Sequence, residues 1–238
     1  MGKNLTQQKR GKGSPRYRAP SFRYAGKVEY PTPRKDIINA TVIDLVDSSG
    51  HSGPLAKVDY GDKEQGLLFA PEGIRVGDSI SAGNSVPLKS GNILPLKDIP
   101  EGTPIYNLES SFGDGGKFVR SSGTFAKIIA KLGGDIIVEL PSRKRRTFNE
   151  NCRATIGIIA GSGRLEKPFL KAGRRYFAMK AKNKLWPIVS ATSMNAVAHP
   201  YGGHSSCRHK CSFATSRNAP PGRKVGKIAP RRTGRTKR

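Results

Sequence analysis

The sequence predicts a mainly β protein made of two small barrels, with a long basic extension at each end of the chain. Between residues 36 and 160, short runs rich in β-branched and aromatic residues recur between turn residues. The segments on either side are rich in Lys, Arg, Gly and Pro. They show no apolar period, so they have no face of their own to bury.

Charge is distributed unevenly along the 238 residues. Residues 1–35 contain ten basic residues and one acidic residue, and residues 167–238 contain eighteen basic residues and no acidic one. Residues 36–166 are nearly neutral, with fifteen basic and sixteen acidic residues, and the whole chain has a formal charge of +26. Such a charge indicates a nucleic acid or an anionic membrane as the partner. A globular enzyme with a basic substrate groove would mix its charges more evenly.

Residues 1–35 are predicted to be a basic N-terminal extension. Tyr17, Phe22, Tyr24 and Tyr30 are interleaved with its cations. Cations neutralise phosphates and aromatic rings stack on unpaired bases, so we interpret this segment as an RNA contact. The alternative is a solvated tail with a few docking aromatics.

Membrane insertion and secretion are not indicated. No apolar run approaches the ~20 residues of a membrane-spanning helix, and the chain opens without the apolar core of a secretory signal. The opening MGKNLT matches a myristoylation pattern, but the Gly- and Pro-rich sequence after it offers no amphipathic face. Three Cys residues give no paired disulfide framework, so a reducing, cytoplasmic location is expected.

Residues 36–109 are predicted to form an OB-like barrel. About five β-rich runs, separated by turn sequences such as Asp-Ser-Ser-Gly and Ser-Gly-Asn, give the strand number of that fold. Its last strand is expected at residues 104–108. Such barrels commonly bind nucleic acid, but the fold alone does not establish that function.

The loop that follows contains Gly115-Gly116-Lys117, which suggests a phosphate-binding loop. The upstream Gly is missing at the required spacing, and Phe118 stands where Ser or Thr should bind magnesium. We therefore predict a loop between domains that carries two cations, Lys117 and Arg120.

Residues 110–190 are predicted to form an SH3-like barrel followed by a helical and extended segment. Gly133-Gly134 is a favourable hairpin turn between two β-rich runs. The basic run at residues 143–146 is expected at a hairpin end, where it can reach a phosphate backbone. Residues 176–184 are compatible with a helix, and Trp186 is expected to anchor the next segment to this barrel, not to stack on a base.

Residues 191–238 are predicted to be a basic C-terminal extension, and here the motifs become specific. The main motifs in and just before this segment are NKLWPIV at 183–189, MNAVAHPYGG at 194–203, SRNAPPGRKVGKIA at 216–229 and RRTGR at 231–235. Shorter motifs lie earlier in the chain: GKGSP at 11–15, NLESSFGDGG at 107–116, CRATIG at 152–157 and KAG at 171–173. Together, and in this order along the chain, they resemble the universal large-subunit ribosomal protein two family, of archaeal and eukaryotic type.

This resemblance covers essentially the whole chain and implies a structural constituent of the large ribosomal subunit that binds rRNA and is not an enzyme. It implies an OB-like and an SH3-like barrel, with arms threaded into the RNA near the peptidyl-transferase region. It also implies support of subunit association and tRNA binding, through contacts with rRNA, neighbouring ribosomal proteins and the small subunit. No intrinsic cofactor is implied, and magnesium is expected with the rRNA.

The candidate rRNA-binding residues are cations and polar side chains of the two extensions, the interdomain loop and the barrel surface. They are Lys9, Arg10, Lys12, Arg16, Arg18, Arg23, Lys117, Arg120, Arg143, Lys144, Arg145, Arg146, Arg153, Arg174, Arg175, Lys184, Asn195, His199, Tyr201, Arg217, Asn218, Arg223, Lys224, Lys227, Arg231, Arg232 and Arg235.

The loop at residues 194–203 departs from the family at one position. The family often has a second His after His-Pro, for which a catalytic role has been proposed, and here that position is Tyr201. Tyr has an unperturbed pKa of about 10, so it cannot accept a proton near neutral pH in the same way. No catalytic residue is therefore carried over, and His199 is expected to form hydrogen bonds within the loop.

A second departure lies just beyond that loop, where His204, Cys207, His209 and Cys211 place four soft ligands within eight residues. Such a set could hold zinc, although C-x₃-C is not a standard zinc-knuckle spacing. The alternative is a reduced loop that faces RNA.

Two other functions remain as alternatives. One is an RNA nuclease that uses His199 and His204 with Lys210, against which it counts that acidic residues stop at Glu166. The other is a zinc-dependent regulator that binds nucleic acid.

Overall fold

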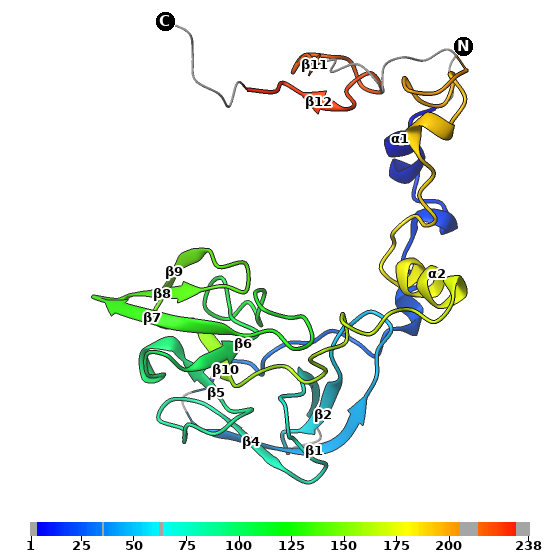
Figure 1. Ribbon diagram of the computed structural model, residues 1–238. Helices are drawn as coiled ribbons and strands as arrows, with labels where there is room; N and C mark the ends of the chain where they lie inside the picture. Colours follow the sequence, from blue (N-terminus) through cyan, green and yellow to red (C-terminus); the bar gives the residue numbers. More distant parts are fainter. Residues whose placement is uncertain (1–3, 35, 62–63, 205–213, 232–238) are drawn as a thin grey trace, which may run out of the picture. The chain divides into compact units, whose positions relative to one another are not determined.

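The computed structural model describes residues 4–34, 36–61, 64–204 and 214–231 (Figure 1). The chain divides into two compact units. Residues 21–171 form the first, here called the barrel unit, and residues 1–20 with 172–238 form the second, here called the arm unit. Within the described residues, no helix is long and apolar enough to cross a membrane.

Ten strands of the barrel unit pair into one sheet, in the order β3-β2-β1-β4-β5-β10-β6-β7-β8-β9. The mainly β class is thereby confirmed. In the first half of the chain the elements are η2 (Ser21–Arg23), β1 (Ile38–Val46), β2 (Leu55–Asp59), β3 (Gln65–Phe69), β4 (Ser79–Ala82), β5 (Ile93–Pro95) and η3 (Leu96–Asp98). The later strands are β6 (Pro104–Tyr106), β7 (Ala126–Leu132), β8 (Asp135–Glu139), β9 (Arg145–Asn149) and β10 (Arg153–Ile156).

Strands β1 to β5 form a first group, here called the OB-like group. Its central strand is β1, which pairs antiparallel with β2 on one side and β4 on the other. Alternate residues of β1 point inward, so Ala40 and Val42 are buried while Thr41 is exposed. Val42 lies opposite Val58, and a bulge after it shifts the register of the strand pair. These inward side chains, with Leu68 and others, form the core of this group.

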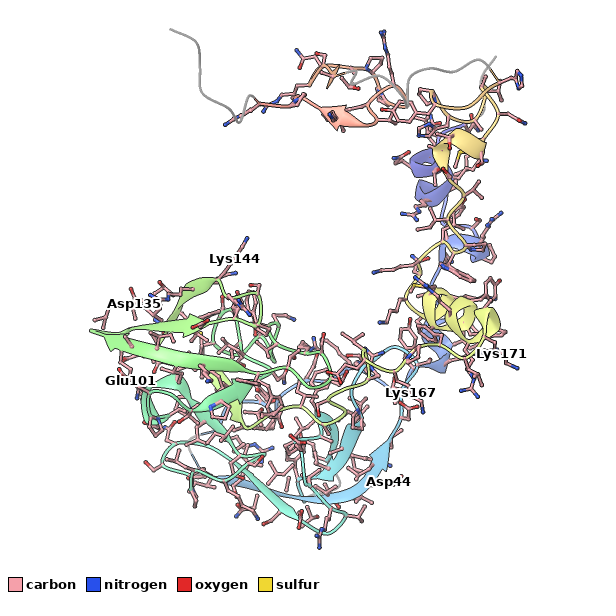
Figure 2. All side chains as sticks on the ribbon, in the orientation of Figure 1. Asp44, Glu101, Asp135, Lys144, Lys167 and Lys171 are labelled. Atoms are coloured by element: carbon pink, nitrogen blue, oxygen red, sulfur yellow. The ribbon has the colours of Figure 1, made fainter. Side chains whose placement is uncertain are left out.

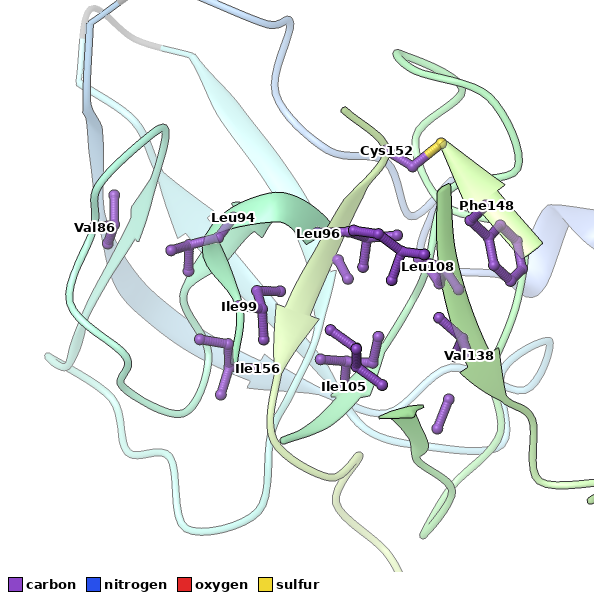
Figure 3. Packing of buried hydrophobic residues seen from close by; sticks show 14 residues of the cluster. Val86, Leu94, Leu96, Ile99, Ile105, Leu108, Val138, Phe148, Cys152 and Ile156 are labelled. Carbon is purple, nitrogen blue, oxygen red and sulfur yellow. The ribbon is translucent and has the colours of Figure 1, made fainter. Parts of the chain in front are cut away.

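Strands β6 to β10 form a second group, here called the SH3-like group. The β7–β8 hairpin turns at Gly133-Gly134, with Leu132 opposite Asp135, as the turn residues predicted. Leu108, Val138 and Phe148 lie together in the core of this group (Figure 3). Each of these three side chains is almost entirely removed from water.

Strand β10 belongs to both groups, because it pairs with β5 on one side and with β6 on the other. Residues 104–108 were predicted to be the last strand of the first barrel. The strand is present as β6, but it belongs to the SH3-like group. Strand β6 pairs with β7 and β10, and Ile105 and Leu108 lie in the second core. The boundaries predicted at residues 35/36, 109/110 and 190/191 stay predictions.

Part of the predicted N-terminal extension docks into the barrel unit. Val28, Tyr30 and Pro31 are buried there. The Tyr30 hydroxyl lies 2.6 Å from the carbonyl oxygen of Asn107 and 2.7 Å from Oγ1 of Thr155. The expectation that Tyr30 stacks on RNA was therefore wrong, because only 7% of this residue is exposed.

The arm unit contains short elements joined by irregular chain. They are α1 (Thr6–Gly11), η1 (Pro15–Tyr17), α2 (Ala172–Ala181), η4 (Ala191–Ser193) and the parallel pair β11 (Ala214–Thr215) and β12 (Lys227–Ile228). None of its described residues has a buried apolar side chain. Trp186, which was expected to anchor its segment to the SH3-like barrel, lies in this unit.

Candidate nucleic-acid interface

The two units differ strongly in their charge. The arm unit carries 22 Lys and Arg residues and no Asp or Glu, whereas the barrel unit carries 21 basic and 17 acidic residues. No side-chain carboxylate is available within the arm unit to neutralise its cations. Their counter-charge must come from outside that unit, and a polyanion supplies it most densely.

The helices of the arm unit place cations in solvent. Lys9 and Arg10 lie in the last turn of α1, where positive charge complements the partial negative charge of the helix end. Arg174 and Arg175 are exposed in the first turns of α2. Both helices lack buried residues, so their cations are accessible to a partner.

The loop at residues 194–203 is held by its own backbone. The Gly203 N–H donates to the carbonyl of Met194 at 3.1 Å, and a side chain on Gly202 would meet that same carbonyl. His199 Nδ1 accepts a hydrogen bond from the Tyr201 N–H at 3.1 Å, and the two rings meet edge to face with centroids 5.3 Å apart. His199 thus serves to shape the loop.

The basic run after β8 is split between a turn and a strand. Arg143, with a positive φ of 61°, and Lys144 form the turn into β9, and Lys144 projects from its end (Figure 2). Arg145 and Arg146 lie in β9 itself. The Arg146 guanidinium lies 4.6 Å from the ring centroid of Phe118, an orientation that cation–π attraction favours.

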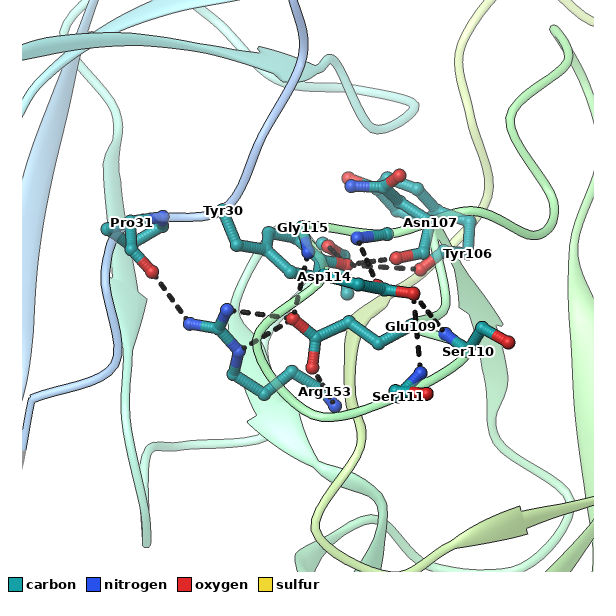
Figure 4. A network of polar contacts seen from close by, with 12 residues as sticks. Tyr30, Pro31, Tyr106, Asn107, Glu109, Ser110, Ser111, Asp114, Gly115 and Arg153 are labelled. Atoms are coloured by element: carbon teal, nitrogen blue, oxygen red, sulfur yellow. Dashed lines mark hydrogen bonds and ion pairs between the residues drawn. The ribbon is translucent and has the colours of Figure 1, made fainter.

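A buried ion pair lies where the N-terminal segment meets the sheet (Figure 4). Arg153 Nη2 is 2.7 Å from Glu109 Oε1, and the Arg153 backbone N–H donates to the other carboxylate oxygen at 2.8 Å. Their side chains are 11% and 0% exposed. Arg153 Nη1 also donates to the carbonyl of Pro31 at 2.7 Å. The guanidinium of this predicted RNA contact is therefore engaged inside the protein.

The Gly-rich loop folds around that carboxylate. The Gly115 N–H lies 3.3 Å from Glu109 Oε1. Gly116 has a φ of 91°, and a Cβ there would lie 2.4 Å from Oδ1 of Asn107. The two glycines therefore permit a close approach to protein atoms. Of the two cations predicted in this loop, Lys117 is exposed, while half-buried Arg120 donates to the carbonyl of Val28.

The other candidate residues lie mostly on the surface. Only Arg120, Arg153, His199 and Tyr201 are half-buried; the remaining described candidates are exposed. The exposed ones are Lys9, Arg10, Lys12, Arg16, Arg18, Arg23, Lys117, Arg143, Lys144, Arg145, Arg146, Arg174, Arg175, Lys184, Asn195, Arg217, Asn218, Arg223, Lys224, Lys227 and Arg231.

Arg232 and Arg235 lie outside the described residues, as do three zinc candidates, Cys207, His209 and Cys211. The fourth, His204, is exposed. Across the described ranges, no group of three His, Cys, Asp or Glu side chains could hold a metal ion.

A β platform with nearly balanced charges, joined to a strongly cationic arm unit whose described part has no apolar core, defines a structural protein that binds a polyanion. The sequence profile described as Ribosomal Proteins L2, C-terminal domain, matches residues 89–226, and the chain belongs to this family of ribosomal proteins. The resemblance stated from the motifs is thereby confirmed.

Three archaeal relatives, each called large ribosomal subunit protein uL2, match nearly end to end. The protein of Nanoarchaeum equitans is 49% identical over 238 residues, covering 100% of both chains. That of Archaeoglobus fulgidus is 48% identical over 98% of this chain and 99% of its own. That of Methanococcus aeolicus is 48% identical over 99% of this chain and 100% of its own. The family is a structural component of the large ribosomal subunit and not an enzyme, which excludes the nuclease alternative.

Proposed function

We propose that this chain organises large-subunit rRNA, with the barrel unit as a folded platform and the arm unit shaped by the RNA that it contacts. One observation carries the proposal: the arm unit holds 22 cations and no acidic residue, and its described part buries no apolar side chain. A segment without a core must gain its order from a partner. The partner that supplies both surface and counter-charge is RNA.

Pro and Gly suit the arm unit to this role. In its described part, two helices and a pair of two-residue strands are joined by irregular chain. Irregular chain of this kind can follow a groove of folded RNA, whose phosphates and loops offer donors and acceptors along the path. Each phosphate that is neutralised releases counterions, so the affinity must fall steeply with salt.

The proposal is tested by comparing the full chain with a chain that ends at residue 193. Binding to protein-free large-subunit rRNA is measured from low to moderate salt, and sedimentation of lysates reports incorporation into subunits. The truncated chain lacks eleven cations. It should fold normally, bind with a shallower salt slope and fail to support subunit function. Binding that is independent of salt, or a full chain that sediments free of the large subunit, would contradict the proposal.

We further propose that the loop at residues 194–203 supports tRNA binding and the peptidyl-transferase region by positioning RNA, and that the protein contributes a contact to the small subunit. Its His199 Nδ1 is already an acceptor for a backbone N–H, which suits a shaping role. His199→Ala should weaken subunit association and slow peptide transfer together if RNA is displaced. A loss of peptide transfer with an unchanged RNA footprint would contradict this role.

Magnesium is proposed to accompany the rRNA, and no metal is assigned to the protein itself. Whether the segment with Cys207 and Cys211 binds zinc is tested by measuring the zinc content of purified subunits with and without Cys207→Ser and Cys211→Ser. A lower zinc content in the variants would assign a zinc site to this segment, and unchanged content would exclude one.

A further inference from the structure

A pocket of about 400 Å³ lies in the arm unit between η1 and the end of α2. Its walls include Arg16, Tyr176, Lys180, Lys184 and Trp186. The volume falls within the roughly 300–1,000 Å³ that small-molecule and cofactor sites occupy. Two aromatic rings and three cations therefore share one concave site.

The sequence builds this pocket by ending α2 sharply. Asn183 takes a φ of 53°, the left-handed conformation that Asn tolerates. The Lys184 N–H then donates to the carbonyl of Met179 at 2.9 Å, and the Asn183 N–H donates to that of Lys180 at 3.0 Å. This pair of bonds is a Schellman motif, which turns the chain back at the helix end.

The two walls follow from that turn. Tyr176 and Lys180 are four residues apart in α2 and so lie on one helix face. The reversed chain brings Lys184 and Trp186 to the same pocket, and Arg16 enters it from η1.

The chemistry of the walls selects an anionic, planar ligand. Arg16 and Lys184 have no carboxylate partner in their own unit, which contains no Asp or Glu. The Arg175 guanidinium lies 5.7 Å from the ring centroid of Trp186, so positive charge also lies against the indole. Half-buried Trp186 and the 42% exposed Tyr176 offer apolar planes beside these cations. A nucleotide combines a planar base with an attached phosphate.

We propose that the pocket formed by Tyr176, Trp186 and Arg16 binds one unpaired nucleotide of RNA. The base stacks on an aromatic ring, and the phosphates lie against Arg16, Lys180 and Lys184. The inference rests on the proposed RNA-organising function, and it assigns a defined base-binding site to the arm unit. It also reverses the expectation that Trp186 only anchors the chain.

Trp186 is the only Trp in the chain, so its fluorescence reports this pocket alone. The full chain is titrated with a short single-stranded RNA of mixed sequence, an abasic oligonucleotide of the same length, and polyglutamate. Binding of each labelled probe is followed separately by anisotropy. We expect the RNA to quench Trp186 strongly and the abasic strand and polyglutamate to quench it weakly, because only the RNA carries bases that stack.

Two variants locate the site. Tyr176→Ala should weaken RNA binding by about tenfold or more, the order expected for a lost base–aromatic stack. Lys184→Gln should weaken RNA quenching more than Lys182→Gln does, since both remove one charge but only Lys184 lines the pocket. Circular dichroism of each variant shows whether α2 persists, and the Lys pair remains informative if Tyr176→Ala loses the helix.

The outcomes separate this inference from the proposed function. RNA that binds without changing Trp186 fluorescence would overturn the pocket and leave the RNA-organising function standing. Equal quenching by the abasic strand would reduce the site to phosphate contacts, and equal quenching by polyglutamate would indicate an acidic protein partner; either result overturns the inference. An absence of binding by the short RNA would also overturn the pocket, whereas the proposed function is overturned only if the full chain does not bind protein-free large-subunit rRNA.

Discussion

Removing the charge of Glu109 should strongly destabilise the barrel unit. Its carboxylate is fully buried and pairs with an Arg153 side chain that is 11% exposed. Removing one partner of a buried pair leaves the other charge uncompensated, at a cost of about 3–5 kcal/mol. Glu109→Gln keeps the shape and one acceptor oxygen, so we expect the lower end, about 3 kcal/mol. In a unit of this size that loss corresponds to a melting temperature lower by roughly 6–12 °C.

The matched control is Glu64→Gln. Glu64 pairs with Arg34 at 3.1 Å, but both side chains are about half exposed, at 48% and 55%. Solvent screens such a pair, so its loss should cost less than about 1 kcal/mol. Thermal unfolding of the full chain, followed by circular dichroism, compares the two variants directly.

A second readout tests where the damage lies. Arg153 holds the carbonyl of Pro31, so loss of Glu109 should release the docked N-terminal segment. Trypsin should then cleave after Lys27 faster in Glu109→Gln than in Glu64→Gln, as mass spectrometry would show. Equal melting temperatures and equal cleavage rates in the two variants would refute the view that this ion pair fastens the segment to the sheet.

Three further outcomes are expected. Tyr30→Phe should lower the free energy of unfolding in urea by about 1–3 kcal/mol, because the buried carbonyl of Asn107 loses its donor; an unchanged midpoint would contradict that contact. Arg143→Gln with Lys144→Gln should reduce the salt slope of rRNA binding by about two while leaving stability unaltered, and a wild-type slope would remove the β8–β9 turn from the interface. Burial raises the pKa of the Cys152 thiol, so in a Cys207→Ser, Cys211→Ser background it should react with a disulfide reagent slowly at pH 8 and quickly once urea unfolds the chain; fast labelling of the native protein would contradict this burial.

The features that sequence predicted well depend on neighbouring residues or on composition. Gly133-Gly134 specifies its own hairpin, because two adjacent residues can adopt the positive φ angles that the turn needs. The concentration of cations in the arm unit follows from a count of residue types and required no knowledge of the fold.

The features that sequence missed depend on distant partners. Nothing near Arg153 distinguishes it from an exposed cation, because its carboxylate partner lies 44 residues earlier. The role of Tyr30 is decided by Thr155, 125 residues away. The sequence also did not predict that β6 pairs with β10, because a local alternation of apolar residues does not encode which distant strand lies beside it.

The pocket formed by Tyr176, Trp186 and Arg16 could be predicted from the sequence only in part. The four-residue spacing of Tyr176 and Lys180 on a helix was visible in the sequence. Their closeness to Trp186 depends on the left-handed turn at Asn183, and Arg16 reaches the pocket from the other end of the chain.

Because β10 pairs with both β5 and β6, it also determines when the two barrels can be completed during synthesis of the chain. Tyr30 and Pro31 are synthesised long before their partners Thr155 and Arg153, and a gap of 125 residues takes about 6–25 s to translate. Until β10 emerges, neither β5 nor β6 has its shared neighbour. Both barrels are therefore completed together by one late strand, and the nascent chain exposes unpaired strand edges and a cationic leading segment until then.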